Sequence, residues 1–224
     1  MDIDTLNKII ISCCKCPRLV EYREYVAKKK KKTYQEWDYW GKPVPAFGEI
    51  GGRLMIVGLA PGAHGSNRTG RMFTGDASGI FLFAALHRSG FANQAISVNK
   101  EDGLKLKDVL ISAVCRCVPP DNKPNRTEIE NCLPYLKQEI GLMKNLQGFV
   151  ALGHIGFDSL LQVYRGWGAS GNRFDFKHGG SYQLGDSLPW LLASYHPSQQ
   201  NTLTGRLTVA MFDEVWQMAK SRLV

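Results

Sequence analysis

A long glycine-rich loop carries most of the side chains in this sequence that could do chemistry. It runs from Gly58 to Asp76 and follows an apolar run at residues 54–57, which predicts a buried strand. Its groups that could grip a nucleotide are Asn67, Arg68 and Arg71. An aromatic residue, Phe73, stands near its end. Because open α/β sheets bind ligands at the carboxyl ends of their strands, the loop predicts a ligand-binding site.

Asp76 has two interpretations. It stands just before a predicted helix, where a carboxylate commonly accepts backbone N–H groups as an N-cap. An ionised carboxylate could also orient or deprotonate a water molecule and offset positive charge on a substrate. The residue pattern alone favours the cap, and one side chain could hold both roles.

Six cysteines form a second group of potential ligands. Four of them could make a thiolate site: Cys13, Cys16, Cys117 and Cys132. Zinc and an iron–sulfur cluster both accept four thiolates, so ligand type does not decide between them. Cys14 and Cys115 are rivals, because Cys115 and Cys117 would point the same way in a strand. The alternative is that these cysteines are small buried hydrophobic residues.

Alternating strand and helix patterns must position these groups. Strands are predicted at residues 54–59, 109–115, 148–152 and 190–195. Helices are predicted at residues 3–13, 79–89, 126–145, 154–164 and 206–222. Residues 20–50 are a polar, aromatic and lysine-rich excursion that is loop-like at 41–45. This order predicts an α/β protein, a three-layer α/β/α sandwich around a four-stranded, mainly parallel sheet. The loops that follow the strands should then converge on one edge of the sheet.

Composition bounds the class of protein. The chain has 224 residues, 44% of them hydrophobic, and a net charge of +8. These values predict one domain with a substantial core and are compatible with a polyanionic partner. No apolar run could span a membrane and the first residues are acidic, so we expect a cytoplasmic protein, in which disulfides are rare. The run Lys28–Lys32 is interpreted as a solvated, mobile loop.

The motifs together resemble the uracil-DNA glycosylases that carry a 4Fe-4S cluster, and most of all the family-five, or B-type, branch. The matching segments are Cys13-x-x-Cys16-Pro-Arg-Leu, Gly58-Leu-Ala-Pro-Gly, Asn67-Arg-Thr-Gly-Arg, Phe73-Thr-Gly-Asp76, Cys117-Val-Pro-Pro-Asp-Asn122-Lys-Pro, Cys132 and His196-Pro-Ser-Gln-Gln-Asn201-Thr. They span the chain from Cys13 to the last predicted helix. Family-four relatives have a glutamate after the first glycine of the first motif, where this chain has Leu59, so the resemblance points to the B-type branch.

The resemblance implies an activity. It is that of a monofunctional glycosylase that flips uracil out of DNA and hydrolyses its N-glycosidic bond, which initiates base excision repair. Hypoxanthine and other deaminated bases are further expected substrates, since B-type enzymes are known for breadth. No lysine stands in a nucleophile's position in the motifs, so lyase chemistry is not expected.

The resemblance also implies a cofactor and an organisation. Cys13, Cys16, Cys117 and Cys132 would hold a structural 4Fe-4S cluster, with zinc as the alternative occupant. Residues 1–224 would form a single domain, in which residues 1–50 are a cluster-binding and loop extension. Uracil-containing DNA is the expected partner, and no association with a membrane is expected. The expected state is a monomer, and a sliding clamp or another repair protein is a candidate contact.

Individual roles follow from the same resemblance. Asp76 would position water and offset charge on the sugar, while His196 would donate a hydrogen bond to the departing base. Phe73 would stack on the base, and Asn122 would pair with its edge. The other substrate-binding candidates are Gly58, Ala60, Pro61, Gly62, His64, Asn67 and Arg68. The DNA-binding candidates are Arg71, Gln199, Gln200, Asn201, Leu203 and Arg206, with Leu203 as the wedge that enters the base stack.

Bland alternatives accompany these roles. His196 could merely end a strand, Phe73 could be a core residue, and Asn122 could belong to an Asx-turn. A non-catalytic metal-cluster protein could also bind nucleic acid through its basic surface without releasing a base. A nucleotide hydrolase with a phosphate-cradling loop is disfavoured, because the Gly58 loop lacks the Lys-Ser/Thr ending of a P-loop.

Overall fold

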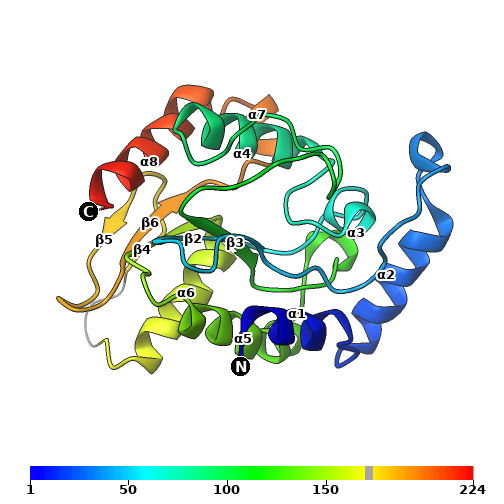
Figure 1. The fold of residues 1–224 in the computed structure, drawn as a ribbon, viewed down its shortest axis with the longest axis horizontal. Coiled ribbons are helices and arrows are strands. Elements are labelled where there is room, and N and C mark those ends of the chain that lie inside the picture. The colour runs from blue at the N-terminus through cyan, green and yellow to red at the C-terminus, as the bar shows by residue number, and fades with distance from the viewer. Residues whose placement is uncertain (170–173, 224) are drawn as a thin grey trace.

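The computed structural model describes residues 1–169 and 174–223, and within them the chain forms one mixed sheet in the order β1-β3-β2-β4-β6-β5 (Figure 1). Its inner strands are parallel: β2 (Leu54–Gly58), β3 (Val109–Ala113), β4 (Gly148–Leu152) and β6 (Trp190–Ser194). Short antiparallel strands, β1 (Phe47–Gly48) and β5 (Ser181–Tyr182), line its two edges. The predicted four-stranded parallel sheet is confirmed. The two-residue edge strands were missed because they are too short to show a periodicity.

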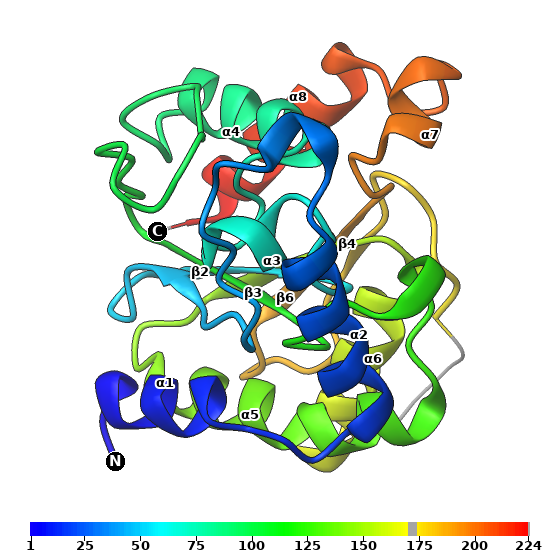
Figure 2. The same ribbon diagram turned by 90° about the vertical axis from the view of Figure 1, so that its right-hand side faces the viewer.

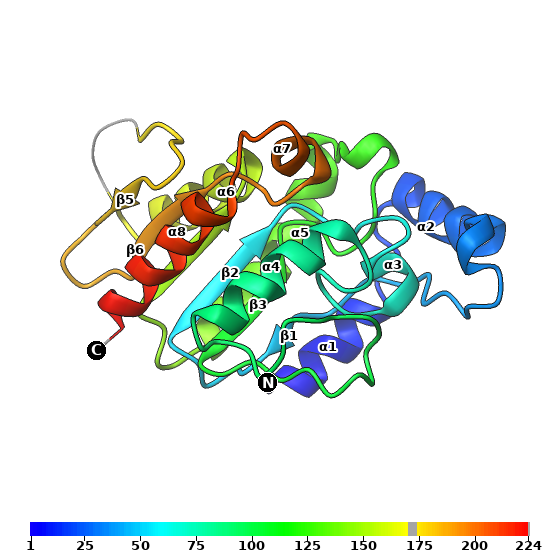
Figure 3. The same ribbon diagram turned by 90° about the horizontal axis from the view of Figure 1, so that it is seen from above.

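Helices cover both faces of the sheet (Figures 1 and 3). One face is covered by α4 (Ala77–Arg88) and α8 (Val209–Arg222). The other is covered by α5 (Arg126–Leu142) and α6 (His154–Gly166), and α1 (Ile3–Ile11) packs against α5. The inner strands are buried along their whole length, and alternate side chains enter opposite cores. Ile56 thus packs toward α4 and α8, while Val57 packs toward α5 and α6.

Several predicted boundaries need correction. The helix predicted at 126–145 ends at Leu142, and the one predicted at 206–222 begins at Val209. A short helix, α7 (Gln199–Leu203), precedes it and has Ser198 as its N-cap. None of the helices among the described residues is long and apolar enough to cross a lipid bilayer.

The first part of the excursion at residues 20–50 contains a helix that was not predicted. Helix α2 (Pro17–Lys29) occupies this stretch and extends from the body of the protein (Figure 1), followed by the 3-10 turn η1 (Lys32–Tyr34). The sequence concealed α2 because its buried face consists of Leu19, Arg23 and Val26, and a buried arginine breaks the apolar pattern. The run Lys28–Lys32 therefore begins as the last turn of a helix, where positive charge is favourable.

An ion pair between Arg116 and Glu139 lies inside the α5 side of the core. Both side chains are almost completely buried, and the Ser112 hydroxyl donates a further hydrogen bond of 2.7 Å to Glu139 Oε2. Substitution Glu139→Leu would leave the Arg116 charge buried without its partner. We expect it to lower the free energy of unfolding by about 3–5 kcal/mol, measured by urea denaturation.

A matched control lies on the same helix. The exposed pair between Arg126 and Glu130 should contribute less than about 1 kcal/mol, so Glu130→Leu should change the stability little. Equal losses in the two variants would contradict the importance of the buried pair.

Candidate active site

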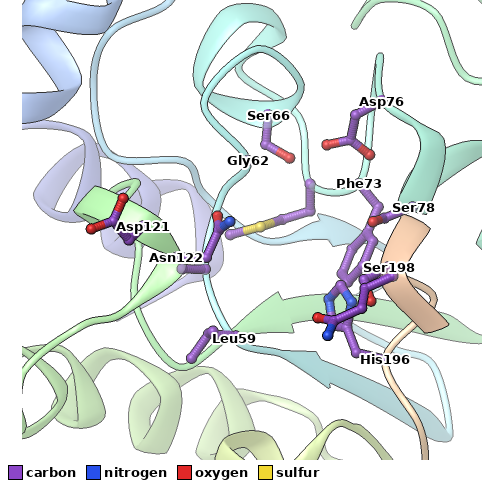
Figure 4. A pocket seen from close by; sticks show the side chains of 13 residues that line it. Leu59, Gly62, Ser66, Phe73, Asp76, Ser78, Asp121, Asn122, His196 and Ser198 are labelled. Carbon is purple, nitrogen blue, oxygen red and sulfur yellow. The ribbon is translucent and has the colours of Figure 1, made fainter.

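A cavity of about 360 Å³ opens where the loops after β2, β3 and β6 meet (Figure 4). Its lining residues are Leu59, Ala60, Gly62, Ser66, Met72, Phe73, Asp76, Ser78, Asp121, Asn122, His196, Ser198 and Gln200. The predicted convergence of these loops on one edge of the sheet is what creates this cavity. Sequence analysis did not single out Ser66, Met72, Ser78, Asp121 or Ser198. The one signal available for Ser78 was its position at the start of a predicted helix, which also describes an ordinary cap.

Asp76 uses its two oxygens differently. Oδ1 accepts a 2.9 Å hydrogen bond from the Gly79 backbone and so caps α4. Oδ2 lies against Gly62 and Gly65, where a Cβ atom on either residue would collide with it. The carboxylate can therefore cap the helix and face the cavity at the same time, and the loop needs glycine at both contacts.

Burial raises the pKa of Asp76 above its ordinary value. The backbone N–H groups of Gly79 and Ser78, together with the positive charge of Arg68, oppose this rise. A carboxylate with a raised pKa is a stronger base once ionised, which suits proton abstraction from water.

Arg68 lies inside the protein, although the sequence suggested that it grips a ligand. In the short helix α3 (Ser66–Thr69), its guanidinium donates to the His64 carbonyl at 2.7 Å and to the Gly75 carbonyl at 2.9 Å. The guanidinium also stacks on Tyr34 and Trp37, 3.9 and 4.0 Å from their ring centroids. This arrangement holds the two ends of the loop together around Asp76.

Asn67 and Arg71 also point inward. The Asn67 amide is fully buried and donates to the Arg23 carbonyl at 3.2 Å. Arg71 forms a buried ion pair with Asp102 at 2.7 Å and a hydrogen bond to Ser97. A loop rich in glycine has few side chains to pack, so these polar groups stabilise it from within. Their placement argues against the suggested contacts of Asn67, Arg68 and Arg71 with substrate or DNA.

His196 follows the end of β6 and lines the cavity. Burial lowers its pKa to about 4, so the imidazole is neutral at pH 7 and carries one N–H donor. Its carbonyl accepts a 2.8 Å hydrogen bond from the Asn201 amide, which fixes the turn into α7. Asn201 therefore has a structural contact behind the cavity wall.

The Phe73 ring lies between Asp76 and His196 in Figure 4 and stacks on the His196 ring, with centroids 5.7 Å apart and 29° between the planes. Its backbone has φ +52°, an unusual conformation for a bulky residue, which indicates that the site imposes strain. A Cβ atom on Gly58 would come within 2.8 Å of the ring. Gly58 thus shapes the cavity through Phe73 without lining it.

Asn122 stands across the cavity from Phe73 and His196 (Figure 4). It ends the 3-10 turn η2 (Pro120–Asn122) with φ +56°, which asparagine tolerates. Its side-chain amide lines the cavity, and no hydrogen bond joins it to another described residue. A donor and an acceptor are therefore available there for a ligand.

The remaining candidates lie around the cavity. His64 shares a hydrogen bond with the Tyr39 hydroxyl at 3.1 Å, and Pro61 lies in the loop outside the lining. Gln199 and Leu203 are exposed on α7, where Leu203 is 82% accessible. Arg206 is also exposed and stacks on Tyr195. Of the six DNA-binding candidates, only Gln200 borders the cavity itself.

A second, smaller cavity brings four cysteines together. It is lined by Cys13, Cys16, Cys117 and Cys132, with Lys15, Leu19, Val20, Pro43, Arg116 and Tyr135. Cys14 is exposed, and Cys115 lies in the hydrophobic core beside α5. The strand predicted at residues 109–115 ends at Ala113, so the alternation expected for Cys115 and Cys117 in a strand does not apply to them.

Polar groups surround these sulfur atoms. Arg23 donates to Cys117 Sγ at 3.1 Å, and the Asn131 amide donates to Cys16 Sγ at 3.5 Å. Burial raises the pKa of Cys117 to about 12, and the charge of Arg23 opposes that rise. A hydrogen bond from the Cys115 thiol lowers the pKa of Cys132. These donors suit sulfur ligands that carry negative charge.

Comparison with known proteins identifies the family. Residues 45–220 match the profile of the uracil DNA glycosylase superfamily. A type-5 uracil-DNA glycosylase of Mycobacterium tuberculosis is 47% identical over 217 residues, which cover 96% of this chain and 80% of that protein. This chain belongs to the uracil-DNA glycosylase superfamily. The type-5 uracil-DNA glycosylase of Thermus thermophilus is 44% identical over 220 residues, or 98% of each chain.

Within the superfamily, this glycosylase is similar to the type-5 branch. Pyrobaculum aerophilum has a type-5 uracil-DNA glycosylase that is 42% identical over 96% of this chain and 91% of its own. Its type-4 uracil-DNA glycosylase is 34% identical over 88% of this chain and 84% of its own. The predicted resemblance to the type-5, or B-type, branch is confirmed. The distinguishing residue, Leu59, lines the cavity.

The effect of the Arg68 charge should be measurable as a change in the pKa of Asp76. In Arg68→Met, a long apolar side chain remains but the positive charge is lost, so the raised pKa of Asp76 should rise further. A carbon-13 NMR titration of the carboxyl groups would measure it.

Arg88→Met is the matched control, because Arg88 pairs with Asp213 at the other end of α4. It should leave the Asp76 pKa where it is in the wild type. An equal Asp76 pKa in wild type and Arg68→Met would show that the carboxylate does not depend on this charge.

Proposed function

We propose that this uracil-DNA glycosylase flips uracil into the cavity and hydrolyses its N-glycosidic bond with Asp76 and His196. One observation carries the assignment: a half-buried carboxylate and a neutral histidine line one cavity, in a chain that shares 42–47% identity with type-5 uracil-DNA glycosylases over nearly its full length. Family membership leaves the non-catalytic cluster protein without support. The arginines of the Gly58 loop point inward and cannot bind phosphate there, which leaves the nucleotide-hydrolase alternative without support.

Asp76 acts on the water. As the bond between sugar and base breaks, its electron pair leaves with the base, and the sugar gains positive charge. Asp76 Oδ2 holds the attacking water, takes its proton as the new C–O bond forms, and offsets the charge on the sugar. A general base of this kind contributes about 100- to 10,000-fold to the rate.

His196 acts on the departing base. Since its pKa is about 4, the ring is not a proton donor to the base at neutral pH. The neutral N–H instead donates a hydrogen bond to the base oxygen on which negative charge develops. One such donor to developing negative charge contributes about 100- to 1,000-fold.

Recognition of the base falls to Phe73 and Asn122. The Phe73 ring, held by a strained backbone, offers a flat face on one side of the cavity. Asn122 offers both a hydrogen-bond donor and an acceptor on the other side. Uracil presents a complementary edge, and hypoxanthine presents a similar carbonyl and N–H. Leu203, exposed on α7, is the wedge that would fill the space left in the stack.

We also propose that the four cysteines hold a 4Fe-4S cluster. The thiols share one cavity, and Arg23, Asn131 and the Arg116 backbone donate to three of their sulfur atoms. Among the residues that the structure describes, no three His, Cys, Asp or Glu side chains are grouped closely enough for a single metal ion. Four thiolates are the ligand set of a 4Fe-4S cluster, and zinc, which accepts the same set, is the alternative occupant.

When bound, the cluster would supply a cross-link. Cys13 and Cys16 flank the turn between α1 and α2, Cys117 precedes η2, and Cys132 lies in α5. The cross-link would hold the start of α2 against the loop that carries Asn122. It takes no part in bond cleavage.

Asp76→Asn and His196→Ala should each impair uracil release. Asparagine keeps the helix cap, so Asp76→Asn should lower the rate by about 100- to 10,000-fold at unchanged stability. His196→Ala should lower it by about 100- to 1,000-fold. The assay is a duplex with one uracil, treated with alkali to cleave abasic sites. Full activity in either variant would overturn the role of that residue.

The cluster makes a separate prediction. Purified protein should absorb visible light, and Cys132→Ser should lose this absorbance together with thermal stability. Cys14→Ser is the control, because Cys14 is exposed outside the cysteine cavity, and it should keep the absorbance. A colourless wild-type protein with one zinc per chain would refute the assignment.

A further inference from the structure

A strongly basic segment lies outside the machinery described above. Residues 28–42, here called the lysine arm, run from the last turn of α2 through η1 to Lys42. The arm contains six lysines and two carboxylates, Glu36 and Asp38, so its net charge is +4, half of the chain's +8. No lysine in it forms an ion pair with a carboxylate of the described residues. Its charge is therefore uncompensated.

The lysine arm is fastened to the loop that forms the cavity. Tyr34 and Trp37 enclose the Arg68 guanidinium, and the Trp40 backbone N–H donates to the Arg68 carbonyl at 2.9 Å. The Tyr39 hydroxyl bridges the Lys31 N–H, at 3.3 Å, and His64 Nδ1, at 3.1 Å. A solvated loop would not make these contacts. They fix the lysines relative to the residues that surround Asp76.

The lysine arm also lies close to the loop that forms the cavity. Figure 2 faces the side that carries α2, and α7 is seen toward the upper right of the same view. Lys28, Lys29, Lys31 and Lys32 are all exposed there. Lys31 is near enough to His64 to help lower the pKa of that histidine, behind burial as the larger cause. The lysine arm is thus attached to the loop that forms the cavity, while Leu203 lies on the separate helix α7.

We propose that the lysine arm binds backbone phosphates of the DNA beside the flipped nucleotide, on the side of the cavity away from α7. This inference rests on the proposed function, because it assumes that DNA covers the cavity. Lysines contact phosphates as point charges and carry no base readout, which suits an enzyme that must find uracil in any sequence. Each neutralised phosphate releases counterions, so the contact must show in the salt dependence of binding.

The decisive variant replaces four lysines with glutamine: Lys28→Gln, Lys29→Gln, Lys31→Gln and Lys32→Gln. Lys30 is kept, because its ammonium group donates to the Gln35 carbonyl within the arm. The matched control replaces four exposed lysines far from the cavity: Lys8→Gln, Lys105→Gln, Lys107→Gln and Lys137→Gln. Both variants lose the same charge, so general electrostatic attraction changes equally.

Binding is measured by fluorescence anisotropy with a uracil-containing duplex at several salt concentrations, with Asp76→Asn in all proteins to prevent turnover. In a plot of log affinity against log salt concentration, the slope should become shallower by about 0.9 for each phosphate contact removed. The arm variant should therefore have a slope shallower by up to about 3.6. Affinity at about 0.1 M salt should fall at least tenfold. The control should keep the parental slope within error. Lys31→Gln alone should reduce the slope by about 0.9, which tests the arm if the fourfold variant does not fold.

Equal slopes in the arm variant and its control would overturn the proposal. Failure of the proposed function is recognised separately, because a protein with an intact Asp76 would then release no uracil whatever its affinity for DNA. If the protein releases uracil but the arm variant and its control have equal salt slopes, only the role proposed for the lysine arm is refuted. A shortened duplex, trimmed on one side of the uracil at a time, should abolish the difference between arm variant and control on one side only.

Discussion

The two oxygens of Asp76 set the constraint on which the site depends. One oxygen must stay on the α4 N-terminus and the other must stay free toward the cavity, so the side chain cannot rotate. Gly62 and Gly65 make this possible by leaving space where any Cβ atom would collide with the carboxylate. The glycine content of the loop is thus a packing requirement around one side chain, and only secondarily a matter of flexibility.

That requirement creates a second one. A loop with so few side chains has little to bury, so it must be stabilised through its backbone. Arg68 bonds to two carbonyls of the loop, while Asn67 and Arg71 tie it to α2 and to the segment near Asp102. Polar residues that resemble ligand-binding groups therefore serve as internal supports. The strained backbone of Phe73 is tolerated because the same network holds its neighbours.

Much of this arrangement was accessible from the sequence, and the rest was not for identifiable reasons. The strands at 54–58 and 148–152 were predictable because a parallel strand buried on both faces is apolar throughout. The meeting of Asp76, Asn122 and His196 followed from the rule that parallel strands end at one edge. In contrast, α2 was hidden by its buried Arg23, and the inward orientation of Arg68 depends on two aromatic rings more than thirty residues earlier in the chain. The choice of Cys117 over Cys115 depended on where β3 ends, and strand ends are poorly defined by periodicity.

Arg23 connects the cysteine segment with the loop that contains Asp76. Its guanidinium donates to Cys117 Sγ, and its carbonyl accepts from the Asn67 amide in the loop that encloses Asp76. The side chain of this buried residue thus contacts one of the clustered cysteines, and its backbone contacts the loop that contains Asp76. Disorder at the cysteines would pull on α2, and α2 could not shift without disturbing the loop. Unfolding of either segment would therefore break a contact that Arg23 makes with the other, which couples the stability of the cysteine segment to that of the loop around Asp76.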